Sequence, residues 1–405
     1  MTSRERVQSA FRHREADRVP RYEQTVCCRV ASDLMGRRMR TGGGRLRWEE
    51  TSARWESEDA WRDYVARMVH DVGDLIRELD FDLAGVPWRH SQKPSATLDE
   101  HTFRYEDPET GLWSVYHFDE VTDVFDLVDS AVRQEGLPAI ERQVAAAERA
   151  AEDALPPKRE DYAELLAVAE RAGGERPLTS GEGFLAIPPE SAWLEACVER
   201  PELVERHLEA NTQMALTAIP ELPRIGISVL WAGGDLASNA GPIYSPAMFR
   251  RFVLPRLQRI THAAHEAGLV YLFRTDGNVW PIARELLVES GIDGYGEIDN
   301  DAGMDMATLK RTFPHLTLWG GVSCGRTLVR GTPDDIRAEV RRVMEACAPR
   351  GGYIFGSSNS IHTGVPTENF VAMQEAAKEF GTYPSWAART GDPQGRDPRK
   401  GGRPT

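Results

Sequence analysis

The 405-residue chain is poor in cysteine, in long apolar runs and in net positive charge. Its five cysteines form no CxxC pair and no Cys/His cluster with zinc-finger spacing, which favours unpaired thiols in a reducing compartment. No stretch approaches the roughly 20 apolar residues of a membrane helix, and residues 1–20 lack the apolar core of a signal peptide. The net charge of −14 opposes non-specific binding to nucleic acid or to anionic membranes. We therefore expect a cytoplasmic protein without nucleic-acid or membrane partners.

What is present is a globular composition, with 41% hydrophobic and 28% charged residues. Apolar side chains at three- and four-residue steps predict amphipathic helices over residues 1–20 and 55–80. Strand-like runs at 102–105 and 113–117 flank the turn signal Asp-Pro-Glu-Thr-Gly and predict a hairpin. The Ala-, Glu- and Arg-rich stretch 139–172 predicts exposed helix.

The second half repeats a unit of short apolar run, polar loop and amphipathic helix. The five runs are Ile225–Trp231, Leu269–Phe273, Ile292–Ile298, Leu316–Val322 and Gly352–Gly356. This alternation predicts a parallel sheet with helices outside it, as an open doubly wound sheet or as a closed barrel. Neither GxGxxG nor GxxxxGK[ST] follows any of the runs, so the two commonest nucleotide signatures are missing.

The number of units favours the closed barrel. Residues 178–381 hold about six units by this pattern, and earlier residues can supply the rest. We predict an α/β fold, a (β/α)8 TIM-type barrel with N-terminal helices and a hairpin insertion. The barrel domain is expected over residues 1–380, with a variable insertion at 90–175. The Gly-, Pro- and Arg-rich residues 384–405 predict a disordered basic tail.

Polar side chains recur directly after the predicted strands, where barrel enzymes carry their active sites. The candidates from this pattern are Asp235, Asn239, Arg274, Asp276, Asn278, Glu297, Asn359 and His362. Several have a structural alternative. Asp235 and Asp276 are each next to glycine and can shape a turn, and His362 can be a solvated loop residue. Arg274 can form an ion pair with Asp276 or bind a substrate carboxylate in a bidentate fork.

Motifs spread over most of the chain resemble one known family. The matching segments are Thr2–Val7, Asp17–Pro20, Gly234–Pro246, Asp276–Asn278, Gly320–Val322, Gly331–Pro333, Gly356–Ile361 and Val365–Asn369. They are similar to the uroporphyrinogen decarboxylase superfamily, which includes uroporphyrinogen decarboxylases and related corrinoid-dependent methyltransferases. The resemblance implies a TIM-type barrel with Asp235, Arg274, Asp276 and Asn359 as pocket positions, whereas residues 90–175 match poorly.

The sequence departs from both branches of that superfamily. Thiol methyltransferases of the family carry a zinc site built on His-x-Cys-Gly and a later cysteine. Here Arg274, Asp276 and Asn359 stand at those positions, and because arginine cannot bind zinc we expect no such site. The decarboxylases carry Arg-Gln-Ala-Gly-Arg-Tyr near the N-terminus. Here the segment reads Arg-Tyr-Glu-Gln-Thr-Val from Arg21, which keeps one candidate anion ligand and argues against porphyrin synthesis itself.

Three hypotheses follow. The first is a cofactor-free decarboxylase of an anionic substrate, with Arg21 or Arg274 as the carboxylate anchor and Asp235 or Asp276 stabilising a cationic intermediate. The second is a methyltransferase acting with a corrinoid on a separate protein.

In the second hypothesis Asp276, Glu297 and His362 polarise a methoxy or amine substrate, and they are the candidate ligands if a divalent metal takes part. The third hypothesis is a non-catalytic ligand-binding barrel. In all three the partner is a small molecule, and a homodimer is a further expectation.

Overall fold

Six parallel strands and two bridged segments form a closed barrel in the computed structural model, which describes residues 1–383. The tail predicted at 384–405 lies outside the described residues. Six of the segments are strands of one sheet, in the order β12-β11-β10-β9-β6-β5. Their bounds are β5 Leu178–Ser180, β6 Ile227–Gly233, β9 Val270–Arg274, β10 Gly294–Ile298, β11 Thr317–Val322 and β12 Tyr353–Ser357.

Two segments from the first quarter of the chain, residues 20–22 and 82–84, complete the barrel. Parallel bridges connect Arg21 to Phe355 of β12 and Ala84 to Leu178 of β5. The backbone hydrogen bonds of the closure run from the amide of Tyr22 to the carbonyl of Phe355 (2.9 Å), from Asp82 to Arg21 (2.8 Å) and from Thr179 to Ala84 (2.9 Å). The prediction of a (β/α)8 barrel whose missing strands come from earlier residues is therefore confirmed.

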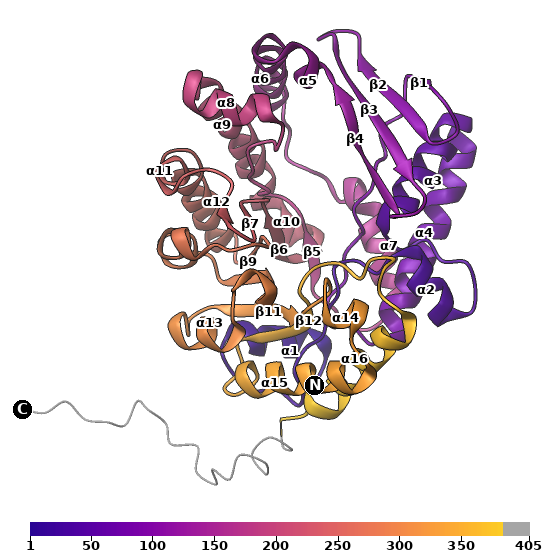
Figure 1. Ribbon diagram of the computed structural model, residues 1–405, viewed down its shortest axis with the longest axis vertical. Helices are drawn as coiled ribbons and strands as arrows, with labels where there is room; N and C mark the ends of the chain where they lie inside the picture. Colours follow the sequence, from indigo (N-terminus) through magenta and orange to yellow (C-terminus); the bar gives the residue numbers. More distant parts are fainter. Residues whose placement is uncertain (384–405) are drawn as a thin grey trace, which may run out of the picture.

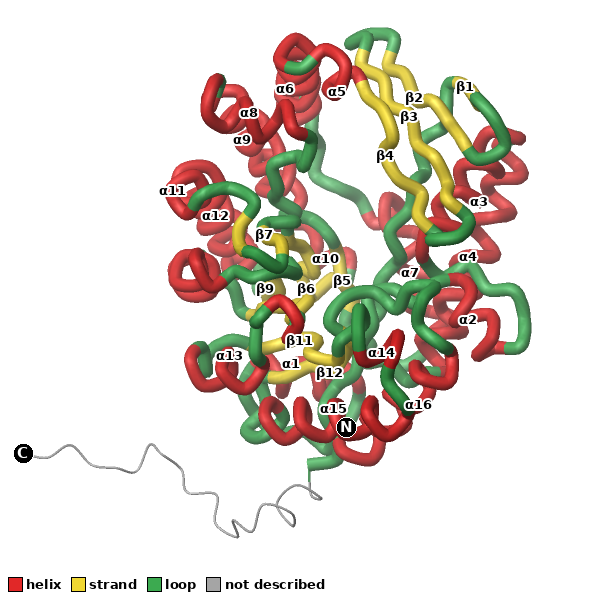
Figure 2. The backbone as a smooth tube through the Cα atoms, in the orientation of Figure 1, coloured by secondary structure: helices red, strands yellow, loops and turns green. Residues whose placement is uncertain are grey.

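Helices surround the barrel strands (Figure 2). Their bounds are α1 Ser3–Phe11, α2 Cys28–Met35, α3 Gly43–Glu56, α4 Glu58–Glu78, α5 Ala131–Glu135, α6 Leu137–Glu152, α7 Ala163–Ala172, α8 Ser191–Glu199, α9 Pro201–Ala218, α10 Leu222–Ile225, α11 Pro246–Met248, α12 Leu254–Glu266, α13 Met306–Thr312, α14 Thr327–Arg330, α15 Pro333–Cys347 and α16 Thr367–Phe380. Of the helices in residues 1–383, none is long and apolar enough to cross a bilayer.

Two helix predictions need correction. The first helix ends at Phe11 rather than near residue 20, and His13, two residues later, takes a positive φ of 52° that turns the chain away from the helical path. The stretch 139–172 holds the two helices α6 and α7, separated around the Pro156-Pro157 pair. Both bury one face, including Ile140 and Val168 at 0% exposure, because alanine-rich helices can carry an apolar stripe that composition alone does not reveal.

The predicted hairpin is part of a larger antiparallel sheet in the insertion. The sheet has the order β1-β2-β3-β4, with bounds β1 Ala96–Thr97, β2 Thr102–Asp107, β3 Leu112–Asp119 and β4 Val124–Ser130. Phe103, Tyr105, Phe118 and Phe125 form its own small core, against which Trp48 of α3 packs. In Figure 1 the sheet lies next to α3 and apart from the barrel strands.

Aromatic side chains fill the barrel interior. The Trp231 ring meets Tyr22 and Trp319 edge to face, each with ring centroids 4.9 Å apart. The Trp319 indole N–H donates to the carbonyl of Tyr22 at 3.0 Å, which ties β11 to the first barrel segment. These rings close the barrel from within and leave space for a ligand above them, at the carboxyl ends of the strands.

Candidate active site

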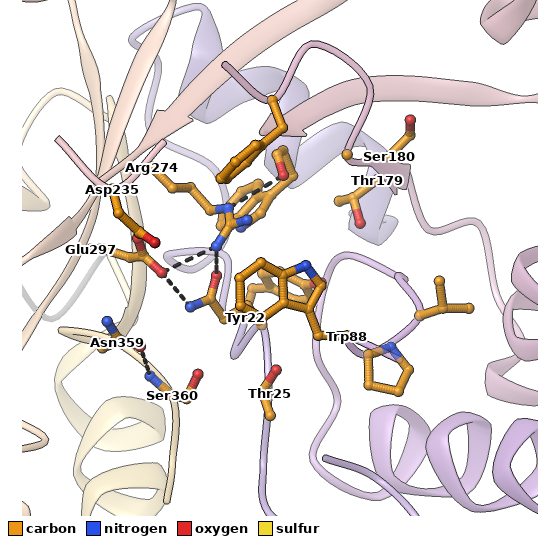
Figure 3. A pocket seen from close by; sticks show the side chains of 16 residues that line it. Tyr22, Thr25, Trp88, Thr179, Ser180, Asp235, Arg274, Glu297, Asn359 and Ser360 are labelled. Carbon is orange, nitrogen blue, oxygen red and sulfur yellow. Dashed lines mark hydrogen bonds and ion pairs between the residues drawn. The ribbon is translucent and has the colours of Figure 1, made fainter. Parts of the chain in front are cut away.

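A cavity of about 320 Å³ opens at the carboxyl ends of the barrel strands (Figure 3). It is lined by residues that come from seven of the barrel segments or the loops after them: Tyr22, Gln24, Thr25, Val86, Pro87, Trp88, Thr179, Ser180, Gly181, Phe184, Trp231, Asp235, Arg274, Glu297, Asn359 and Ser360. In Figure 3 Asp235 and Glu297 lie beside Arg274 on one side, and Trp88 lies on the other. This is the place where α/β barrels carry their active sites.

Arg274 is the centre of a hydrogen-bond network in the wall of the cavity. Its Nη1 donates to Gln24 Oε1 at 2.5 Å and pairs with Glu297 Oε1 at 3.1 Å, and its Nε donates to the Trp231 carbonyl at 3.3 Å. Gln24 Nε2 in turn donates to Glu297 Oε1 at 2.5 Å. Of the two roles open from sequence, the ion pair exists, but its partner is Glu297 rather than Asp276.

Glu297 is held in an unusual setting. Its side chain is 9% exposed, and its backbone has a φ of +62°, which costs energy for a residue other than glycine. Burial raises the pKa of Glu297, and the charge of Arg274 and the hydrogen bond from Gln24 oppose that rise. A strained and buried acid in a cavity wall is typical of functional sites.

Asp276 lies behind the cavity wall, where it binds a lining residue. Asn359 Nδ2 donates to Asp276 Oδ2 at 3.2 Å, and Asn359 itself lines the cavity. Burial raises the pKa of Asp276, and the negative charges of Asp235 and Asp299 raise it further. This carboxyl therefore binds a proton more readily than an exposed aspartate does. The pair connects the loops after β9 and β12.

Asp235 reaches the cavity because two glycines precede it. A Cβ atom on Gly233 would lie 1.9 Å from the carbonyl oxygen of Arg274, so only glycine allows β6 and β9 to approach this closely here. Asp235 is exposed to the cavity and has no hydrogen bond or ion pair with any residue in 1–383. Its carboxylate is therefore available to a ligand.

Glu23 is a buried acid that the sequence analysis did not select. It is 4% exposed, and its Oε1 accepts the Ser357 amide at 2.9 Å. Ser357 Oγ lies 2.6 Å from Glu23 Oε2 and 2.7 Å from the carbonyl of Asn359. A hydroxyl has one hydrogen, so both short contacts are satisfied when Ser357 donates to Asn359 and a protonated Glu23 donates to Ser357. Burial raises the pKa of Glu23 to about 8, which agrees with that arrangement.

Arg21 does not line the cavity, which corrects its prediction as an anion ligand there. Its side chain is 3% exposed, and Nη2 pairs with Asp80 Oδ2 at 3.2 Å. Its backbone amide donates to Asp82 Oδ2 at 2.8 Å, beside the ion pairs that Arg18 makes with both acids. Side chains alternate along an extended segment, and the next residue, Tyr22, is the one that lines the cavity.

Asn239 and Asn278 also lie outside the cavity lining. Asn239 is exposed in the turn between β7 (Ala237–Ser238) and β8 (Gly241–Pro242). Asn278 accepts the Trp280 amide at 3.1 Å, so its side chain shapes the loop after β9. Both residues are at the predicted end of the barrel, but their side chains are not among those that line the cavity.

Both ring nitrogens of His362 are hydrogen-bonded to the backbone, one within its own loop and one to the loop after β11. Nδ1 accepts the Gly364 amide at 3.1 Å, so Nε2 carries the hydrogen and donates to the Cys324 carbonyl at 3.1 Å. Glu297 is paired with Arg274, and no group of three or more His, Cys, Asp or Glu residues within 1–383 is arranged to hold a metal ion. The structure therefore does not bring the candidate ligands Asp276, Glu297 and His362 together.

The fold and the cavity define an α/β barrel with a binding site at its strand ends, and comparisons with known proteins narrow this class. Residues 190–380 match the family model described as Uroporphyrinogen decarboxylase (URO-D). The curated uroporphyrinogen decarboxylases of Alkalilimnicola ehrlichii and Burkholderia pseudomallei (strain 668) are each 28% identical to this chain, over 187 and 225 residues. These matches cover 45% and 49% of this chain and 48% and 59% of those proteins, so the chain spans about half the length of the curated relatives it matches.

Among solved structures, a methyltransferase from Methanosarcina mazei is similar with a TM-score of 0.61 and 17% identity, covering 94% of this chain and 99% of that one. That likeness supports the barrel fold. The family match and the curated relatives confirm the resemblance to the uroporphyrinogen decarboxylase superfamily that the sequence motifs indicated. The charge and the volume of the cavity bear on the choice between decarboxylation and methyl transfer.

Most of the residues that line the cavity were not among the candidates from the sequence, Tyr22, Gln24, Trp88 and Trp231 among them. Tyr22 and Gln24 belong to the segment that resembles the arginine motif of the decarboxylases, in which only Arg21 has the positive charge expected of an anion ligand. Trp231 is the last residue of a predicted strand, a position that points to the mouth of a barrel. Trp88 follows a barrel segment too short to show a strand pattern.

Proposed function

We propose that the chain is a methyltransferase of the uroporphyrinogen decarboxylase superfamily, which moves a methyl group from a small molecule to a corrinoid carried by a separate protein. The observation that carries the proposal is the charge of the cavity. Arg274 is the one cationic residue among the described residues that line it, and Glu297 already pairs with it. Asp235 and the nearby Asp276 leave an excess of negative charge, which favours a neutral or cationic group over several carboxylates.

The size of the cavity supports the same choice. Its 320 Å³ is at the small end of the roughly 300–1,000 Å³ of pockets that hold drug-sized ligands. A tetrapyrrole with eight carboxylates would need more space and more cationic partners than one paired arginine. We therefore propose a compact substrate in place of a porphyrinogen.

In the proposed reaction the bond between the methyl carbon and its nitrogen or oxygen breaks. The electron pair of that bond would stay on the heteroatom, and the electron pair for the new bond to carbon would come from a reduced corrinoid on the partner protein. A quaternary ammonium group leaves as a neutral amine and needs no proton, whereas an oxygen leaving group needs one. Glu297 pairs with Arg274 and is not free to supply that proton, so a quaternary ammonium group is the substrate that asks least of this cavity.

The mouth of the cavity fits the approach of a large flat cofactor. Val86, Trp88 and Phe184 line the cavity and are nevertheless 41%, 67% and 41% exposed. Apolar surface is therefore available at the opening, where a macrocycle on a partner protein would have to cover the substrate. These residues would contact the macrocycle and exclude water from the cavity, which strengthens the electrostatic interactions within it.

The test is substrate-dependent methylation of free cob(I)alamin by the purified protein, followed by its absorbance, with methylated ammonium and methoxy compounds offered in parallel. We expect cob(I)alamin to be consumed with at least one of these compounds. For Asp235→Asn we expect kcat/KM to fall by about tenfold or more, which is about 1.4 kcal/mol. Glu266→Gln, an exposed carboxylate on α12 outside the cavity, is the matched control. Carbon dioxide release or coproporphyrinogen formation without any methylation would refute the proposal.

A further inference from the structure

We infer that the cavity selects a zwitterion, a small carboxylate that carries a methylated quaternary ammonium group, as in the betaines. The inference rests on the proposed function and deepens it by naming the substrate class. It is built on groups of both charges and on aromatic rings that face one small cavity. Each of these features requires something different of the ligand.

The ammonium end is indicated by Asp235. This carboxylate lines the cavity and is the lining acid that has no hydrogen bond or ion pair in residues 1–383, whereas Glu297 is already paired with Arg274. A quaternary ammonium has no N–H, so it needs a nearby negative charge rather than a hydrogen-bond acceptor in fixed geometry.

The methyl groups are indicated by the aromatic residues. Tyr22, Trp88, Phe184 and Trp231 all line the cavity. Aromatic faces attract methylated ammonium groups through the ring quadrupole, with tryptophan the strongest partner, and the attraction grows when water is excluded. In Figure 3 Trp88 lies opposite the wall that holds Asp235 and Arg274, so a small cation between them would meet both a ring and a carboxylate.

The carboxylate end is indicated by two donors without partners. Trp231 is 5% exposed, and its buried Nε1 has no hydrogen-bond acceptor in residues 1–383. Arg274 uses Nε and Nη1 in its protein contacts and leaves Nη2 without one in the same part of the chain. A buried indole N–H costs free energy while it is unsatisfied, and a ligand carboxylate would satisfy it together with the guanidinium.

The two charges of the cavity also exclude simpler ligands. A plain cation would satisfy Asp235 but would approach the guanidinium of Arg274, and a plain anion would meet Asp235 and Asp276. A zwitterion of matching length satisfies both ends, and like-charge contacts reject the alternatives.

Isothermal titration with four compounds of nearly equal shape tests the inference without any corrinoid. Glycine betaine has both charges, choline lacks the carboxylate, 3,3-dimethylbutanoate replaces the ammonium by carbon, and 3,3-dimethylbutan-1-ol lacks both charges. We expect glycine betaine to bind the wild-type protein at least about tenfold more tightly than each of the others. Asp235→Asn is expected to remove the preference over 3,3-dimethylbutanoate, and Trp231→Phe to reduce the preference over choline.

Each half of the inference has its own refutation. Equal binding of glycine betaine and 3,3-dimethylbutanoate, or a preference unchanged in Asp235→Asn, would overturn the ammonium assignment. Equal binding of glycine betaine and choline would overturn the carboxylate assignment. Glu266→Gln is the control and should keep all four affinities, and thermal unfolding of each variant shows that it is folded.

Failure of the inference and failure of the proposed function give different results. Selective betaine binding with no methyl transfer to cob(I)alamin would keep the substrate class and refute methyl transfer. Methyl transfer from a methoxy compound with no betaine binding would keep the function and refute the substrate class.

Discussion

Replacing Glu23 by glutamine should change how the stability of the protein depends on pH. In the folded protein burial raises the Glu23 pKa from its ordinary 4.5 to about 8. The folded state therefore holds one more proton than the unfolded chain between these values, and the free energy of unfolding falls as pH rises through this window. The stabilisation is complete below about pH 4.5 and is lost above about pH 8, where both states are ionised.

The size of the effect follows from the same values. A rise from 4.5 to about 8 corresponds to about 5 kcal/mol at 1.36 kcal/mol per pH unit, of which about 3 kcal/mol falls between pH 5.5 and 8. Glutamine has no titrating proton, and its amide can donate to Ser357 Oγ as the protonated acid does. The variant should thus match the wild type below about pH 4.5 and become progressively more stable than it as the pH rises to 8 and above.

Urea unfolding of both proteins across pH 5.5 to 9 measures the difference directly. The difference in unfolding free energy between Glu23→Gln and wild type should grow by about 3 kcal/mol over this range. Glu266→Gln, an exposed change of the same type, should give a flat difference. A flat difference for Glu23→Gln as well would show that Glu23 is ionised at neutral pH and would refute the hydrogen-bond assignment.

Three further predictions concern the cavity wall and a helix start. Arg274→Gln should cost about 3–5 kcal/mol in urea unfolding because it leaves the Glu297 charge buried without a partner, and the double variant with Glu297→Gln should recover most of that loss; a double variant no more stable than Arg274→Gln would contradict the pairing. Gly233→Ala should lower stability by more than about 2 kcal/mol, since its Cβ would overlap the neighbouring strand, whereas Gly325→Ala, where the space is open, should not. Thr332→Ala should cost about 1 kcal/mol in thermal unfolding by removing the N-cap of α15, and an unchanged Tm would show that the cap is dispensable.

The periodic part of the fold could be predicted because its signal is local. The five apolar runs of the second half became β6, β9, β10, β11 and β12, with the helices expected after most of them. The first two barrel segments could not be seen in the same way. Each makes a single isolated bridge rather than a strand, and tertiary hydrogen bonds such as Tyr22 to Phe355 hold it, so no local pattern marks it.

The sequence indicated which end of the barrel the candidate residues occupy better than it indicated which residues they contact. Asp235, Arg274, Glu297 and Asn359 line one cavity, as residues after parallel strands should. Their partners depend on segments far away in sequence, and the partner of Arg274 turned out to be Glu297 on the next strand. Arg21 is the opposite case, because a residue one position along an extended segment points to the other side.

The closure of the barrel by residues 20–22 has a consequence for the order of folding. This segment pairs with Phe355, more than three hundred residues later in the chain, and it carries the cavity residue Tyr22, with Gln24 directly after it in the chain. During synthesis the segment leaves the ribosome before β12, so it can pair with residues 82–84 early, but its other edge has no partner until β12 has been made. The ligand site is thus assembled by the most distant contact in the barrel and should be among the last parts to become native.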